Sequence, residues 1–105
     1  MNPHGPGVYL NTIADELYYF DCGWKWRPMG GTIYFEVLGF KPGEQVRVSY
    51  EVLLVQDRTY YTTLTADANG NVSMAFDSTN AVKGHYHWWF EAGSASYCGH
   101  YDPPS

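Results

Sequence analysis

Cations are scarce in this chain: six Lys and Arg stand against eleven Asp and Glu, which gives a formal net charge of −5. The few cations are scattered along the sequence. Binding to nucleic acid or to an anionic membrane surface depends on clustered Lys and Arg side chains. We therefore expect neither as a partner.

Long apolar runs are missing as well. No stretch approaches the roughly 18–20 residues of a membrane-spanning helix, so we do not expect membrane insertion. The opening residues, MNPHGPGVYL, have neither the basic start nor the apolar segment of a signal peptide. Met1 therefore begins either a piece of a longer secreted protein or a small protein assembled outside the cytoplasm, and the sequence leaves both open. The 105 residues suit one domain, 1–105, with flexible ends at 1–7 and 102–105.

Helical periodicity is also absent, and strict alternation of apolar and polar residues takes its place. Alternation runs through residues 32–37, 45–54 and 71–76, and it is typical of half-buried strands. In the second run, Val52 and Leu54 continue the inward face. The predicted core consists of Ile33, Phe35, Val37, Phe40, Val46, Val48, Tyr50, Leu64, Val72, Met74, Phe76, Tyr86, Trp88 and Phe90.

Turn signals separate these runs. Residues 41–44 read KPGE, which suits a turn with φ > 0 at Gly43. The dipeptide Asn69-Gly70 is a strong hairpin signal, so we predict an antiparallel hairpin between residues 60–67 and 71–77. Further strands are predicted at 7–12 on a sheet edge, at 16–22, and at the C-terminal end before Pro103. About seven to eight short strands with such turns indicate an all-β, antiparallel sandwich.

Aromatic residues make up 18% of the chain, which is more than a core of this size needs, so some rings should reach the surface. They are densest in GHYHWWFE, residues 84–91. On a strand, alternate side chains point to opposite faces. Tyr86, Trp88 and Phe90 then face the core, while His85, His87, Trp89 and Glu91 face outward. The neighbouring tryptophans are therefore predicted to lie on opposite faces.

The two cysteines, Cys22 and Cys98, lie near the two ends of the chain. An even count favours a disulfide, and the alternative is a pair of buried free thiols. The cysteines are 76 residues apart, so a bridge would stabilise the fold by roughly 4–5 kcal/mol on the loop-entropy model. A bridge would also require the first and last strands to lie close together.

Three segments resemble bacterial immunoglobulin-like domains of secreted and cell-surface proteins: GGTIYFEVLGFKPGEQVRVSY, TLTADANGNVSMAF and KGHYHWWFEAGSAS. The resemblance spans about Gly30 to Ser96. It implies a Greek-key immunoglobulin-like sandwich and transfers no catalytic residues. Such domains act as adhesive, spacer and carbohydrate-associated modules, and similar domains decorate phage particles. This chain departs from them in its aromatic excess, its cysteines and the insert YYFDCGWKWRPM, which argues against an inert spacer.

Exposed aromatic rings are the candidate binding residues. Trp24 and Trp26 flank Lys25 and precede Arg27, an arrangement that suits stacking on sugars or anchoring a protein interface. The alternative is that the tryptophans cover one end of the sandwich. Counting from Leu64, alternation turns Tyr60 inward and Tyr61 outward. Tyr61 and Trp89 could then form one exposed patch with Leu53 and Val55.

Metal and catalytic signals are weak. His85 and His87 are two residues apart on one strand face and could hold Zn²⁺ or Cu²⁺. A third ligand would have to come from Glu91, His100 or Asp21, so we predict no metal and no cofactor. Ser94 and Ser96 lack the strand–turn–helix setting of a nucleophile elbow, and no carboxylate pair faces across a predicted cleft. We therefore do not expect an enzyme.

These observations favour a non-catalytic recognition module, extracellular or on a particle surface. It would bind carbohydrate through Trp24, Trp26, Tyr61 and Trp89, with Arg27 beside them. The alternative is a structural assembly subunit, such as a virion decoration protein or a surface-filament protein, whose rings contact protein. The expected partner is therefore a polysaccharide or a protein surface, and self-association is left open.

Overall fold

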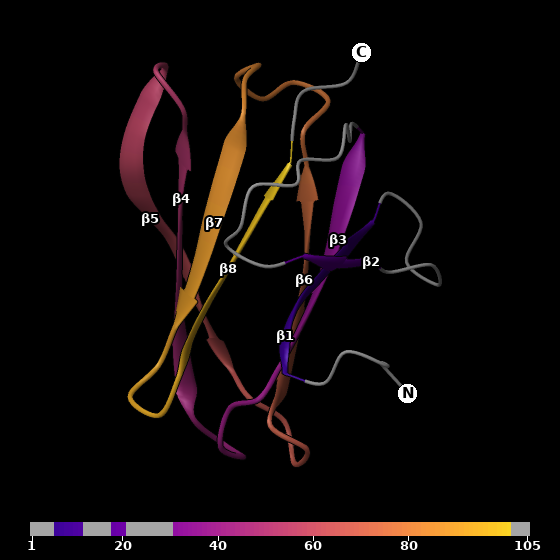
Figure 1. Ribbon diagram of the computed structural model, residues 1–105, viewed down its shortest axis with the longest axis vertical. Helices are drawn as coiled ribbons and strands as arrows, with labels where there is room; N and C mark the ends of the chain where they lie inside the picture. The colour runs from indigo at the N-terminus through magenta and orange to yellow at the C-terminus, as the bar shows by residue number, and fades with distance from the viewer. Residues whose placement is uncertain (1–5, 12–17, 21–30, 102–105) are drawn as a thin grey trace.

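The computed structural model of the protein describes residues 6–11, 18–20 and 31–101 (Figure 1). These residues form strands and turns, without a helix among them. The eight strands are β1 (Gly7–Asn11), β2 (Tyr18–Phe20), β3 (Thr32–Leu38), β4 (Gln45–Val52), β5 (Gln56–Thr65), β6 (Asn71–Asp77), β7 (Tyr86–Glu91) and β8 (Ser96–Tyr101). β1 begins at Gly7, inside the stretch 1–7 that was predicted to be a flexible end.

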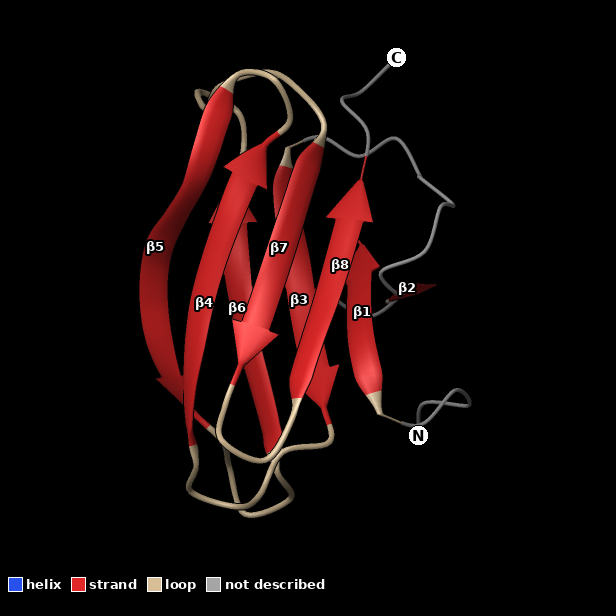
Figure 2. Cartoon of the chain, turned by 60° about the vertical axis from the view of Figure 1, so that its left-hand side comes forward, coloured by secondary structure: helices blue, strands red, loops and turns tan. Residues whose placement is uncertain are grey.

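The strands form two four-stranded sheets that face each other (Figures 1 and 2). One sheet has the order β2-β1-β3-β6 and the other has the order β5-β4-β7-β8. All neighbouring strands are antiparallel. The prediction of an all-β antiparallel sandwich is confirmed. The expectation that the first strand lies on a sheet edge is wrong, because β1 pairs with both β2 and β3.

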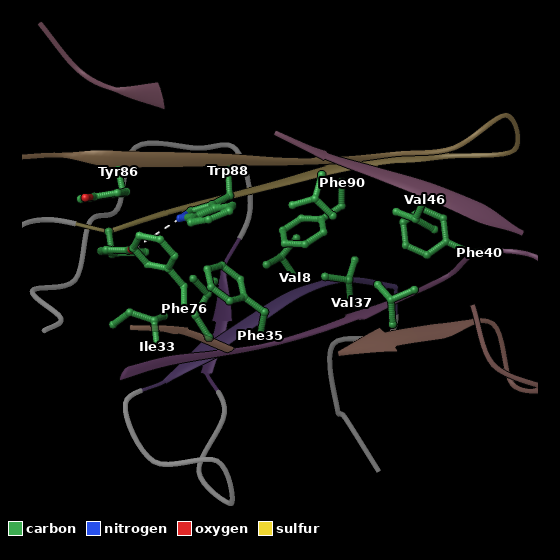
Figure 3. Packing of buried hydrophobic residues seen from close by; sticks show 14 of the residues in the cluster. Val8, Ile33, Phe35, Val37, Phe40, Val46, Phe76, Tyr86, Trp88 and Phe90 are labelled. Carbon is green, nitrogen blue, oxygen red and sulfur yellow. Dashed lines mark hydrogen bonds between the residues drawn. The ribbon is translucent and has the colours of Figure 1, made fainter. Parts of the chain in front are cut away.

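The core lies between the two sheets and follows the predicted alternation (Figure 3). β3 and β7 each show a regular alternation of buried and half-buried residues. Of the predicted core residues, Tyr50, Leu64 and Met74 are partly buried against the core, and the others are buried. Val52, predicted on the inward face, is also buried in this core, as are Val8, Leu10, Ala66 and Tyr101, which the sequence did not indicate.

Trp88 is at the centre of the core, with no exposed surface. Its ring centroid lies 5.0 Å from that of Phe35 on the opposite sheet and 4.7 Å from that of Tyr50 on the neighbouring strand. Its indole N–H donates to the Tyr101 hydroxyl at 3.3 Å, the dashed line in Figure 3. A buried indole needs such a partner. The prediction that Trp88 is a core ring is confirmed.

The predicted hairpin between residues 60–67 and 71–77 is wrong. The turn itself forms, since Gly70 has φ +79° and Asp67 Oδ1 accepts from two backbone amides after it. However, β5 pairs with β4 and β6 pairs with β3, so the chain crosses from one sheet to the other at this turn. Phe40 fixes the corner, because its amide donates to Gly70 O at 3.1 Å and a Cβ on Gly70 would lie 2.1 Å from Phe40 O.

The first and last strands lie close together, as a bridge between the cysteines would require. β1 packs against β8, where a Cβ added to Gly99 would lie 2.8 Å from Val8 Cγ1. β2 also approaches β8. Cys98 is buried, and no cysteine in the described part of the chain is a free thiol. Cys22 lies outside the described residues, so the Cys22–Cys98 bridge itself stays a prediction.

Candidate functional site

Of the five predicted binding residues, the described part of the chain contains Tyr61 and Trp89. Trp24, Trp26 and Arg27 lie outside the described residues. The proposal that those three bind a ligand therefore stays a prediction, and the surface has to be built from the described strands.

Tyr61 points into the sandwich, so the prediction that it faces outward is wrong. Its ring lies 5.3 Å from Trp88 and 5.8 Å from Phe76, both edge-on, although 39% of the residue remains exposed. Tyr60 instead faces outward, beneath the guanidinium of Arg47 at 4.6 Å. The cause is a β-bulge: Val48 pairs with Thr62, but the next residue of β4, Ser49, pairs with Tyr60. The extra residue reverses the alternation along β5.

Trp89 lies on the outer face of its sheet, as predicted, and it is flanked by two side chains. The His87 ring stacks on it, with centroids 4.3 Å apart and planes 17° apart. The Arg58 guanidinium carbon lies 4.2 Å from the indole centroid. Arg58 donates to Ser49 Oγ at 3.0 Å and is paired with Glu91, two residues beyond Trp89 on β7. His87 and the Glu91-bound Arg58 therefore flank the indole along the strand.

This geometry separates the two predicted binding rings. Tyr61 faces the interior between the sheets, whereas Trp89 is on the outer face of the same sheet. They cannot form one patch. Stacking a sugar on Trp89 would require Arg58 or His87 to move aside, which would break a cation–π or ring contact. The described residues therefore give the predicted carbohydrate platform little support.

The histidines are arranged differently from the predicted pair. His87 lies directly opposite His100 on β8 and opposite Glu51 on β4, and the two imidazole centroids are 5.7 Å apart. Burial and the neighbouring His100 lower the pKa of His87, while Glu51 raises it and Arg58 lowers it further. His85 precedes β7 and is exposed. Within residues 6–11, 18–20 and 31–101, no cluster of three metal-binding side chains occurs.

The serine near the last turn has a structural role. Ser94 donates its backbone N–H to Glu44 Oε2 at 3.0 Å and its hydroxyl to Glu44 Oε1. The Lys41 amide donates to the same carboxylate at 3.2 Å. The Ser94 hydroxyl, followed by these backbone bonds, lowers the pKa of Glu44. The carboxylate therefore ties the turn after β7 to the turn before β4.

The turn between β4 and β5 lies at the upper end of the molecule in Figure 1. Aliphatic side chains of this turn and of the loop before β7 are exposed. We call Leu53, Leu54, Val55 and Val82 the apolar tip; their exposed fractions are 46%, 100%, 59% and 45%. The loop before β7 packs against this turn. A Cβ on Gly84 would lie 2.4 Å from Val52 Cγ1, and the Leu53 amide donates to His85 O at 2.9 Å.

Leu54 is the least expected member of the apolar tip. Val55 N–H donates to Val52 O at 2.9 Å, which closes a turn with Leu54 at its third position and φ +63°. That backbone conformation favours Gly or Asn and is unfavourable for a branched side chain. Alternation placed Leu54 on the inward face, and that prediction is wrong because β4 ends at Val52. The prediction that Leu53 and Val55 are exposed agrees with the structure.

The comparisons with known proteins identify no relative. No family model, curated protein or solved structure matches this chain. Among the described residues, no helix is long and apolar enough to cross a membrane.

Proposed function

We propose that this protein is a non-catalytic immunoglobulin-like module that docks on another protein through the apolar tip. It would act outside the cytoplasm or on a particle surface, as a recognition or assembly component. The exposed Leu54, held at positive φ, is the observation that carries this proposal. A strained backbone at an exposed position suggests that the side chain is retained for contact rather than for stability.

The strand order supports the immunoglobulin-like assignment. Taken along the chain, β1, β3 and β6 correspond to strands A, B and E of that fold. β4, β5, β7 and β8 correspond to C, C′, F and G, in the sheet order C′-C-F-G. Tyr86 at the start of β7 donates its hydroxyl to Val82 O, four residues upstream. This contact resembles the tyrosine corner that immunoglobulin-like domains form at the start of strand F.

The centre of the core also supports the immunoglobulin-like assignment, because a tryptophan stands there at the position of a cysteine in antibody domains. Antibody domains carry a cysteine two residues after the corner tyrosine, bridged to strand B. Here that position is Trp88, and its ring contacts Phe35 of β3, the strand-B equivalent, at 5.0 Å. An aromatic contact would then take the place of the disulfide between the sheets. The predicted Cys22–Cys98 bridge would be a different one, which ties the N-terminal region to β8.

The chemistry of the apolar tip favours protein over sugar or lipid. Its four exposed members are aliphatic, and sugars are bound by flat aromatic rings. The net charge of −5 disfavours an anionic membrane. An exposed aliphatic cluster of this kind usually marks a contact with another protein. The alternative of carbohydrate binding through Trp24 and Trp26 stays a prediction on residues outside those that the structure describes.

The test uses three immobilised proteins: the wild type, Leu54→Ala and Thr63→Ala. Thr63 is an exposed residue on the outer face of β5 and serves as the matched control. Proteins captured from the native source are quantified by mass spectrometry, and each is then purified and titrated against the three variants. We expect a partner whose affinity falls by about tenfold on Leu54→Ala, or about 1.4 kcal/mol, and is unchanged on Thr63→Ala.

A glycan array probed with the same proteins distinguishes carbohydrate binding, the alternative, from docking through the apolar tip. Glycan retention that survives Leu54→Ala but is lost on Trp24→Ala and Trp26→Ala would support carbohydrate binding and contradict docking through the apolar tip. Protein capture that is equal for all three immobilised proteins would also contradict our proposal.

A further inference from the structure

The two sheets of the sandwich are not aligned strand for strand. β3 lies beneath β7, as the contact of Phe35 with Trp88 indicates, and β6 lies beneath β4, where Phe76 and Tyr50 are 5.9 Å apart. β5 is one strand further out than β4 in its sheet, whereas β6 ends the other sheet. In Figure 2, β5 accordingly stands outside β6 at the left. Among the described strands, none lies beside β6 under β5.

The inner face of β5 is left half covered as a result. Thr62 and Leu64 pair with the buried Val48 and Val46, so they point inward, yet both remain partly exposed. Tyr61, turned inward by the bulge, is 39% exposed. None of the ten residues of β5 is buried. A strand added beside β6 would cover these side chains.

The two outer strands differ in how well their edges are protected. β5 is bulged twice against β4, with shifts after Val48 and after Tyr50, and bulges discourage edge-to-edge pairing. β6 pairs with β3 in an unbroken register over all seven residues. It contains no Pro, no Lys and no bulge, and its one charged residue, Asp77, is at its end. Its free backbone edge is therefore open to hydrogen bonding with an added strand.

We propose that the free edge of β6, beneath β5, accepts an extended segment of a partner protein as an added strand. The segment would place alternate apolar residues against Tyr61, Leu64 and Met74, and polar or basic residues outward. The outward preference follows from charge, because Asp77 ends β6 and Glu36 lies opposite Ser73 on the outer face. This mode of recognition relies on backbone hydrogen bonds for affinity and on alternate side chains for specificity.

A second copy of β6 does not fit this position. Edge strands paired about a two-fold axis would bring the two β4 strands within about 5 Å of each other above the joined sheet. Each β5, which lies one strand further out, would then have to occupy the space of the other copy's β4. The occupant is therefore a single extended segment. The inference goes beyond docking through the apolar tip, and the two can fail separately.

The probe is a synthetic peptide with the sequence of β3, Thr32–Leu38, flanked by lysines. β3 already pairs with β6 at its other edge, so its alternation of side chains suits this strand. In the free protein, alternate β6 amides should exchange rapidly with solvent deuterium, since alternate N–H groups of an edge strand lack a partner. Saturating peptide should protect those amides, and a peptide N-methylated on alternate residues should not.

Two neighbouring threonines provide the matched protein variants. Thr62 faces the proposed position and Thr63 faces outward, so Thr62→Lys and Thr63→Lys change net charge equally. We expect Thr62→Lys to weaken peptide binding about tenfold or more, because an ammonium group would be desolvated beneath β5. Thr63→Lys and Leu54→Ala should leave binding unchanged.

Three results would overturn the inference. The first is full protection of all β6 amides in the free protein, which would mean that the edge is already covered. The second is a β3 peptide that fails to protect them at millimolar concentration. The third is protection that the N-methylated peptide reproduces. None of the three depends on whether the Thr62→Lys variant folds.

Discussion

The centre of the sandwich and the β4–β5 hairpin contain similar apolar side chains but use them in opposite ways. The Trp88 ring is surrounded by the rings of Phe35, Tyr50, Tyr61 and Phe76, and the backbone of β7 follows regular alternation. In the hairpin the backbone is bulged twice, Leu54 has positive φ, and Leu53 to Val55 lie in solvent. On the function that we propose, the centre is built for stability, whereas the hairpin sacrifices some stability for contact.

The largest expected effect is at the centre. Replacing the fully buried Trp88 by alanine removes contacts to Phe35, Tyr50 and Phe76, and it should cost about 3–5 kcal/mol of unfolding free energy. Trp89→Ala is the matched control on the other face. It removes one ring contact and one cation–π contact, for about 1 kcal/mol. Urea unfolding of both variants measures the contrast, and equal losses would contradict the assigned faces.

A smaller loss is expected at the corner between the two regions. Tyr86→Phe removes the hydrogen bond to Val82 O while keeping the stacked contact with Tyr101, at 5.3 Å. The expected cost is about 1 kcal/mol. Tyr97→Phe removes the bond from its hydroxyl to Gly39 O at the far end and serves as the comparison. If Tyr86→Phe unfolds at the wild-type urea midpoint, Tyr86 is not a structural corner.

In the hairpin between β4 and β5, we expect a substitution to raise the free energy of unfolding rather than to lower it. Leu54→Gly relieves the unfavourable φ, so it should be more stable than Leu54→Ala by about 1 kcal/mol. Leu54→Ala should unfold like the wild type, because the wild-type side chain is fully exposed. Chemical unfolding of the three proteins measures both differences. A Leu54→Gly protein less stable than Leu54→Ala would show that the turn is not strained.

The smallest expected effect is a change in stability with pH, caused by His87 on the outer face of its sheet. Burial and the facing His100 lower the folded-state pKa of His87, so the unfolded chain takes up a proton first as pH falls. Stability from this group is complete above its unfolded pKa of about 6.5 and is lost as pH falls through the lower folded value.

His87→Gln should flatten the thermal melting temperature between pH 7 and pH 5, compared with the wild type. His85→Gln is the control on the exposed neighbour. Glu44 and Asp77 also have lowered pKa values, but they titrate below this range. A wild-type melting temperature that is constant from pH 7 to pH 5 would contradict this assignment.

Wherever a strand is regular, the sequence alone predicted which face of the sheet each side chain occupies. Alternation placed Trp88 inside and Trp89 outside, because a pleated backbone forces consecutive side chains apart. The same rule failed at Tyr61, where a bulge added one residue to β5 without any Gly or Pro to mark it. It failed at Leu54 for a similar reason, since an all-aliphatic turn carries no turn signal.

The pairing of strands into sheets was harder to predict than the face of the sheet on which each side chain lies. Asn69-Gly70 does form a tight turn, but a tight turn can close a hairpin or lead the chain to the opposite sheet. The choice depends on Phe40, whose backbone meets Gly70 from a distant part of the chain. The candidate site was predicted only in part: Leu53 and Val55 were expected at the surface, whereas the exposed Val82, on the loop that packs against their turn, was not predicted.

The most direct test of the account is to measure unfolding and partner affinity on the same preparations of wild type and Leu54→Gly. We predict changes of opposite sign: Leu54→Gly should be about 1 kcal/mol more stable than the wild type and should bind the captured partner about tenfold more weakly. A variant that loses stability but keeps full affinity would contradict the claim that the apolar tip is a contact surface.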